Sequence, residues 1–314
     1  MRILQICGAS GLCLLSGLWG QISAPIGAQG SAGMTASGNY VTRVGKDILS
    51  LSLASLIRTS LGGFKEGHKS LEDTYTAVSP FSPLKDGPGR KVVDLIPVAS
   101  LESLGGIPEQ VTLNMRFVDV GGAMPLHDLI AILSLAKNQN PRAALEIGTY
   151  FGSTTVNLAL NLPESTIHTI DLPEDTTEAE TLVAGQPVDD LHLIRGRQLG
   201  KSFRGTPLEQ RIVQHQGDTA TYDYSSIQEP VSFFLIDGSH TYDYARSDTL
   251  RCFALAKGES TFLWHDCDRH HAGVTTWLVE MIKAGLPVVR VKDTSLGYMK
   301  IDVQDPRVQR VLSL

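Results

Sequence analysis

Between residues 143 and 302, short apolar runs alternate with segments of helical periodicity, and this alternation restricts the chain to few folds. The candidate strands are 143–148, 167–171, 211–216, 231–237, 260–266, 287–291 and 297–302. Their apolar residues do not alternate strictly with polar ones, which is typical of strands buried on both faces of a parallel sheet. The last two runs are close enough in the chain to form an antiparallel hairpin. We therefore predict an α/β fold with a Rossmann-like, doubly wound sheet of seven mainly parallel strands, an antiparallel last strand and an N-terminal extension.

Helices are predicted between these strands wherever apolar residues recur every three and four positions. One stripe consists of Leu126, Leu129, Ile130 and Leu133, and Asn140-Pro141 ends that helix. Two later stripes consist of Tyr242, Ala245, Thr249, Phe253 and Ala256, and of Val274, Trp277, Leu278, Met281 and Ile282. A further helix is expected at about 47–60, ahead of a stretch punctuated by Pro and Gly.

The 314 residues suffice for one large domain or for a smaller domain with an extension. We expect a tail and linker at 1–40, an accessory region at 41–120, the main domain at 121–302 and a C-terminal tail at 303–314. The first twenty residues are apolar, which also suggests a signal peptide, but glycines and serines interrupt them and no clear cleavage site follows. We interpret them as a tail.

Charge and cysteine content narrow the class of partner. The chain has 27 Lys and Arg against 33 Asp and Glu, a net charge of −6, which disfavours binding to nucleic acid. Its four cysteines contain no C-x-x-C pair, so neither a structural zinc nor a disulfide framework is indicated. A cytoplasmic protein that acts on a small molecule, without nucleic acid or membrane, fits best, and a homo-oligomer stays open.

The first predicted strand ends in ALEIGTYFGSTT, where an acid precedes two glycines. In an open parallel sheet, ligands bind beyond the carboxyl ends of the strands. Gly148 and Gly152 let the backbone approach a ligand and free the N–H groups of the next helix. A dinucleotide fingerprint has three glycines, and an acid directly before them, here Glu146, would repel a pyrophosphate. The motif instead suits a ligand with an ammonium group.

This motif resembles the first motif of the class I methyltransferases that use S-adenosylmethionine. The resemblance implies that the methionine end of the cofactor is lined by Glu146, Gly148, Tyr150, Gly152 and Thr154. A tight turn in another doubly wound protein is the alternative for the motif alone.

Two further strand ends carry acids that suit a nucleoside. Asp171 ends the second strand, where a carboxylate can accept both ribose hydroxyls, in methyltransferases as in nicotinamide enzymes. Asp218 follows the third strand, and the resemblance implies that it lies beside the adenine. A helix N-cap is an equally good interpretation of Asp218.

The fourth and fifth strand ends, FFLIDGSH and FLWHDCD, aim Asp237 and Asp266 into one crevice. This pair of motifs resembles a bacterial branch of small-molecule methyltransferases, related more distantly to catechol and caffeoyl-coenzyme A O-methyltransferases. In those relatives a Lys three residues after the first Asp deprotonates the acceptor hydroxyl, and His240 occupies that position here. An imidazole can take a proton at neutral pH, so His240 is the predicted catalytic base. A structural histidine is the alternative.

The same resemblance implies that Asp237 and Asp266 bind a divalent metal ion, Mg²⁺ in the relatives. The third ligand of catechol-type enzymes is an Asn, and Cys267 occupies its position, which puts a requirement for Mg²⁺ in doubt. His265 or Asp268 could complete such a site. Of His270 and His271, we expect one to face solvent and the other to line the substrate mouth.

We therefore predict an enzyme that transfers a methyl group from S-adenosylmethionine to a hydroxyl group of a small molecule. Two other functions stay open: an NAD-dependent oxidoreductase on the same fold, and a nucleoside-binding protein without catalysis. The residues do not identify the acceptor.

Overall fold

The computed structural model describes residues 3–7, 92–105, 110–117, 122–176 and 197–313. They belong to one of two units of the chain, which comprises Met1–Cys13 and Asp86–Leu314. The other unit, Leu14–Lys85, lies outside the described residues, and so does the helix predicted at 47–60.

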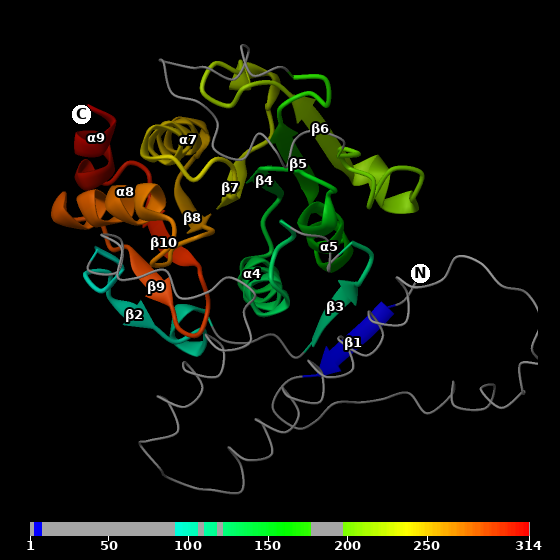
Figure 1. Cartoon of the computed structure of the whole chain (residues 1–314), viewed down its shortest axis with the longest axis horizontal. Helices are drawn as coiled ribbons and strands as arrows, with labels where there is room; N and C mark the ends of the chain where they lie inside the picture. Colours follow the sequence, from blue (N-terminus) through cyan, green and yellow to red (C-terminus); the bar gives the residue numbers. More distant parts are fainter. Residues whose placement is uncertain (1–2, 8–91, 106–109, 118–121, 177–196, 314) are drawn as a thin grey trace, which may run out of the picture. The chain divides into compact units, whose positions relative to one another are not determined.

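The described chain is built on a sheet of eight strands in the order β2-β9-β10-β8-β7-β4-β5-β6 (Figure 1). Their bounds are β2 Val98–Ala99, β4 Ala143–Ile147, β5 Thr166–Asp171, β6 Ile212–Gln216, β7 Val231–Ile236, β8 Glu259–Trp264, β9 Val289–Val291 and β10 Gly297–Asp302. Within this sheet, β10 runs antiparallel to both of its neighbours, β8 and β9, and every other neighbouring pair is parallel. The predicted doubly wound, mainly parallel sheet with an antiparallel last strand is confirmed.

The sheet has one strand more than the seven predicted. The additional strand is β2, whose two residues pair in parallel with β9 at one edge. The amide of Arg290 donates to the carbonyl of Pro97 (2.7 Å), and that of Lys292 donates to Ala99 (2.8 Å). Two residues are too few to produce a periodic pattern, so the sequence carried no signal for this strand.

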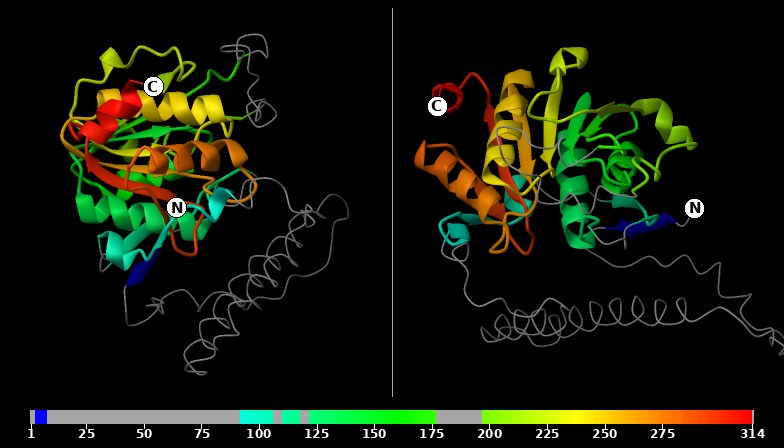
Figure 2. Two further views of the ribbon diagram at one scale, coloured as in Figure 1. Left: turned by 90° about the vertical axis from the view of Figure 1, so that its left-hand side faces the viewer. Right: turned by 45° about the horizontal axis from the view of Figure 1, so that its top comes forward.

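Helices cover both faces of the sheet (Figure 2). The helices α4 (Leu126–Gln139) and α5 (Ser153–Asn161) pack on one face, and α7 (Tyr242–Leu255), α8 (Ala272–Lys283) and α9 (Pro306–Leu312) pack on the other. Neighbouring strand residues point to opposite cores: Phe234 packs with the α7 side and Phe233 with the α4 side. Burial on both faces explains why the strands lack polar alternation.

The predicted helices begin and end where the local sequence requires. Asn140 ends α4 in the left-handed conformation, with its N–H on the carbonyl of Ala136, and Pro141 follows. Thr241 caps the N-terminus of α7, where its side chain accepts from the amide of Tyr244. Three short 3₁₀ helices complete the described elements: η1 (Glu102–Leu104), η3 (Pro207–Arg211) and η4 (Tyr224–Ser226). No helix within the described ranges has the length and apolar character needed to cross a membrane.

Segments on either side of 121–302 also pack onto this unit. β1 (Ile3–Cys7), within the expected tail, pairs antiparallel with β3 (Gln110–Asn114), within the expected accessory region. Asn157 on α5 joins β3 to the core, because its side chain accepts from the amide of Asn114 (2.7 Å) and donates to the carbonyl of Asn114 (3.1 Å). Helix α9, within the expected C-terminal tail, buries Val308 and Val311 in the core of the α7 side.

Candidate functional site

The acids predicted from the strand ends gather at the carboxyl edge of the sheet. Ile147 at the end of β4 is level with Ile170 on β5 and with Ile236 on β7, and Ile236 is level with Trp264 on β8. The residue that follows each of these four positions therefore lies at the same edge. The predicted meeting of the strand ends is present in the structure.

The turn after β4 lies directly against the end of β7. Gly148 has a φ of +98°, and a Cβ atom there would lie 1.9 Å from the carbonyl oxygen of Asp237. Glycine is therefore required both by conformation and by space. Tyr150 in the same turn also has a positive φ, +48°, and Gly152 precedes the first turn of α5, in which Thr154 is buried.

Glu146 is buried, and its partners are hydroxyl groups. The hydroxyl of Thr169 donates to Glu146 Oε2 (2.9 Å), and the hydroxyl of Thr155 donates to the same oxygen. Burial raises the pKa of Glu146 to about 8, although the two hydrogen bonds oppose the shift. At neutral pH the carboxyl group is therefore mainly protonated before any cationic ligand binds.

The side chain of Asp171 binds the backbone of the turn after β4. Its Oδ2 accepts from the amide of Tyr150 (2.8 Å), and its Oδ1 accepts from the amide of Leu172 (2.7 Å). Arg197 also reaches Oδ1, at 2.9 Å, and this guanidinium is buried. The carboxylate of Asp171, which is predicted to receive the ribose hydroxyls, thus also holds the turn 148–152 in place.

Asp218, beyond β6, has partners on two elements. Its Oδ1 accepts from the amide of Ala220 (2.9 Å), and its Oδ2 accepts from the hydroxyl of Tyr244 on α7 (3.0 Å). The second contact connects the end of β6 with the helix that follows β7.

Asp237 and Asp266 both lie at one nitrogen of the His265 imidazole. Nδ1 of His265 is 2.9 Å from Asp237 Oδ1 and 3.0 Å from Asp266 Oδ2, and its Nε2 is 3.2 Å from Asp128 Oδ2. Burial alone would lower the pKa of His265, but the carboxylates of Asp237 and Asp128 outweigh it and raise that pKa well above the usual value. Burial raises the pKa of Asp237.

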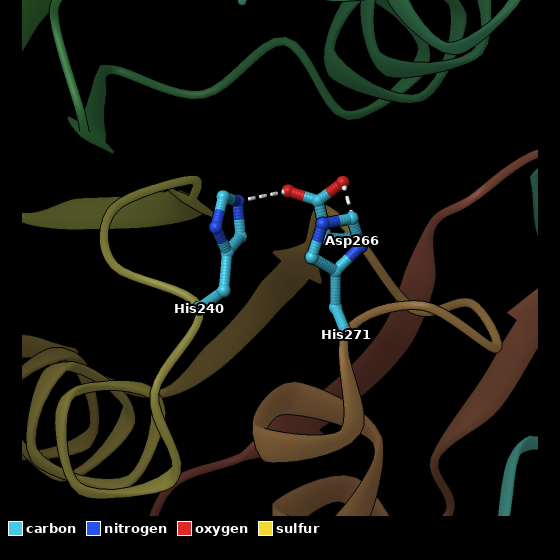
Figure 3. Close-up of side chains that lie close together, drawn as sticks. All are labelled: His240, Asp266 and His271. Carbon is cyan, nitrogen blue, oxygen red and sulfur yellow. Dashed lines mark ion pairs between the residues drawn. The ribbon is translucent and has the colours of Figure 1, made fainter. Parts of the chain in front are cut away.

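Asp266 also lies between two further imidazoles (Figure 3). His240 Nε2 is 2.6 Å from Asp266 Oδ2, His271 Nδ1 is 3.3 Å from Asp266 Oδ1, and the two ring centroids are 4.4 Å apart. Burial opposes ionisation of Asp266, but the hydrogen bonds from His240 and His265 hold its pKa well below the usual range. Asp266 has a φ of +57°, an uncommon conformation for a residue other than glycine and a frequent one at functional sites.

Close backbone packing fixes the spacing of these histidines. Gly273, in the first turn of α8, lies so near the loop after β7 that a Cβ atom there would be 2.3 Å from the carbonyl oxygen of His240. A small pocket opens at this point, and its lining includes Asp237, His240 and Asp266. His270 is exposed, as expected for one member of the pair, whereas His271, the residue before α8, is half-buried; the expected place of His271 at the substrate mouth stays a prediction.

The residues at the ends of β7 and β8 have donors that suit a divalent ion. Two groups have ligand atoms within 4.8 Å of one another: Asp237, His265 and Asp266, and His240, Asp266 and His271. Both groups combine carboxylate oxygen with imidazole nitrogen, a donor set that suits several first-row ions. Cys267 belongs to neither group, and burial raises the pKa of its thiol to about 12.

Several residues of this edge were not predicted. Asp128, Arg197 and Tyr244 carry no motif, and only the fold brings them to the acids they contact. Arg211, by contrast, donates to the carbonyls of Ala159 and Leu162 at the end of α5. Its role there is structural.

Comparison with known proteins gives one family match. Residues 145–267 match the family described as "Methyltransferase domain". No curated protein matches the chain. Among solved structures, the O-methyltransferase TomG from Streptomyces achromogenes, in complex with SAM, is 15% identical with a TM-score of 0.41, over 76% of this chain and 99% of that chain. The SAH-bound methyltransferase PaMTH1 from Podospora anserina is 12% identical with a TM-score of 0.43, over 76% and 97% of the two chains.

Proposed function

From the premise that residues 145–267 are a methyltransferase domain, we propose that this protein transfers a methyl group from S-adenosylmethionine to a hydroxyl group of a small molecule. The observation that carries the proposal is the gathering of Glu146, Asp171, Asp237 and Asp266 at one edge of the sheet, with His240 Nε2 2.6 Å from Asp266 Oδ2.

The cofactor is proposed to bind at the ends of β4, β5 and β6. The turn 148–152 comes within backbone contact of β7 and opens α5, whose N–H groups favour a carboxylate such as that of the methionine end. Thr154 lies in that first helical turn. Glu146 faces the ammonium group in this proposal, Asp171 the ribose hydroxyls, and Asp218 the adenine.

Methyl transfer from a sulfonium is an in-line displacement, so the acceptor oxygen must lie behind the methyl carbon and lose its proton. We assign proton acceptance to His240, since Asp266 can hold the ring in place and stabilise the imidazolium that forms. A positioned base contributes typically 10²- to 10⁴-fold to such a reaction.

Asp237 and Asp266 are the proposed ligands of a divalent ion, and the donors around them fit such an ion. When bound there, the ion would lower the pKa of an acceptor hydroxyl. The net charge of −6 favours a small hydroxylated molecule over a nucleic acid as acceptor. We also propose a cytoplasmic location, and a homo-oligomer is compatible with this proposal.

Calorimetry tests the cofactor first. The full chain is titrated with S-adenosylhomocysteine and, separately, with NAD, and we expect heat of binding from the first alone. Binding of NAD instead would favour an oxidoreductase and reject the proposal.

The second experiment supplies S-adenosylmethionine and a panel of sugar, catechol and polyketide-type hydroxyl compounds, with mass spectrometry as the readout. A product heavier by one methyl group supports catalysis. Tight binding of S-adenosylhomocysteine without any such product would favour a protein that only binds the nucleoside.

A further inference from the structure

Asp128, in the first turn of α4, is a completely buried acid on an element that carries none of the motifs. Its Oδ1 accepts from the amide of Ser295 (3.2 Å), and its Oδ2 accepts from the hydroxyl of the same residue. Oδ2 also lies 3.2 Å from His265 Nε2. The turn between β9 and β10 and the end of β8 therefore meet on this one carboxylate.

The contact with Asp128 determines how the His265 ring is turned. Because Nε2 faces Asp128, Nδ1 faces the pair formed by Asp237 Oδ1, at 2.9 Å, and Asp266 Oδ2, at 3.0 Å. The ring is nearly buried and has little room to rotate.

This arrangement requires a positive charge among three acceptors. When the ring is neutral and Nε2 carries the hydrogen that bonds to Asp128, Nδ1 presents a lone pair to two carboxylate oxygens. Three acceptors at such distances repel one another unless a proton or a metal ion lies between them. A metal-bound imidazole characteristically donates its other ring N–H to a carboxylate, and Asp128 is in that position.

We infer that Asp128 is the outer partner of a metal site in which His265 Nδ1 is the third ligand beside Asp237 and Asp266, and that the site takes a first-row transition ion such as Mn²⁺, Co²⁺ or Zn²⁺ in preference to Mg²⁺. The inference rests on the proposed function. Mg²⁺ prefers oxygen donors in near-ideal octahedral geometry, whereas imidazole nitrogen suits the transition ions. The preference follows from a nitrogen that the fold holds between the two acids.

The test is metal binding by the full chain without a histidine tag, after removal of bound metal with a chelator. Calorimetry with Mn²⁺, Zn²⁺ and Mg²⁺, and the visible absorption of added Co²⁺, give affinities that do not depend on turnover. We expect one ion per chain and at least about tenfold weaker binding of Mg²⁺ than of Mn²⁺. Equal or tighter binding of Mg²⁺ would overturn the inference.

Asp128→Asn tests the outer partner, and we expect its affinity for Mn²⁺ and Co²⁺ to fall by about 10- to 100-fold. Asp243→Asn is the matched control, because Asp243 is an exposed acid in the first turn of α7 and undergoes the same change of charge. Near-ultraviolet circular dichroism verifies folding. If Asp128→Asn does not fold, His265→Gln replaces it, with the same expected loss.

Further outcomes separate this inference from the proposed function. A chain that binds S-adenosylhomocysteine but no metal ion would show that a proton holds the three acceptors together, which overturns the metal site and leaves methyl transfer intact. Metal binding that His271→Ala abolishes and His265→Gln does not would move the ion to the group of His240, Asp266 and His271 and also overturn it.

Discussion

The two halves of the functional edge satisfy their acids with different chemistry. At the ends of β4, β5 and β6, the carboxyl groups are held by hydroxyls, backbone amides and the guanidinium of Arg197. At the ends of β7 and β8, the partners of Asp237 and Asp266 are the imidazoles of His240, His265 and His271. Hydroxyls, backbone amides and a guanidinium keep their protons at neutral pH, whereas an imidazole can gain or lose a proton there. This difference agrees with the proposed function, in which the first half binds the cofactor and the second transfers the proton.

The largest effect is expected from His240→Ala. Turnover should fall by at least about a hundredfold, since a positioned base is lost, while the affinity for S-adenosylhomocysteine stays nearly unchanged. Steady-state kinetics and calorimetry measure the two quantities. His270→Ala is the control, because His270 is an exposed histidine next to His271 in the chain and should retain full turnover. Unchanged turnover in His240→Ala would show that His240 is not the base, and proton transfer could then not be assigned to it.

The next largest effect concerns Glu146 and pH. Its pKa of about 8 in the folded protein exceeds the value of 4.5 for a free side chain, so the folded state binds this proton more tightly than the unfolded state. Its contribution to the free energy of unfolding is therefore greatest below about pH 4.5 and falls by about 1.4 kcal/mol per pH unit until about pH 8. Glu146→Gln removes this loss, because the amide keeps an acceptor for the threonine hydroxyls without ionising.

Urea unfolding of both proteins at about pH 5.5 and pH 7.5 measures that change. Relative to the wild type, the variant should gain roughly 3 kcal/mol between the two conditions, and the histidines cancel in the difference. Parallel pH profiles of the two proteins would mean that Glu146 is ionised in the folded chain, although its side-chain partners are neutral hydroxyl groups.

The smallest effect is expected from Tyr244→Phe, which removes one donor from Asp218. The amide of Ala220 still holds the other carboxylate oxygen. We expect a loss of about 0.5–1.5 kcal/mol in the free energy of unfolding and an affinity for S-adenosylhomocysteine weakened by less than about tenfold. A loss beyond about a hundredfold would contradict a binding half in which several independent donors hold the acids.

Much of the fold and part of the site were predictable, because both follow from local patterns. Seven strands and three helices had runs long enough to show their periodicity, and parallel strands that end in acids must bring those acids to one edge. The methyltransferase family is confirmed for residues 145–267. The assigned roles of the site residues stay predictions.

What could not be predicted depends on contacts between distant segments. Asp128 reads in the sequence as an ordinary acid of a helix first turn, and its meeting with His265 and Ser295 exists only once α4, β8 and the turn before β10 are assembled. Likewise, no periodic pattern marks β2, and nothing in ALEIG reveals that two threonine hydroxyls will share one oxygen of Glu146.

The close packing at Gly273 has a consequence for how acceptor preference could change. Since no side chain fits between the start of α8 and the backbone of His240, any side chain at position 273 would push the loop after β7 away from this helix. Mutations that change the preferred acceptor are therefore expected at other positions of the edge, where they leave Gly273 and the spacing of the histidines unchanged.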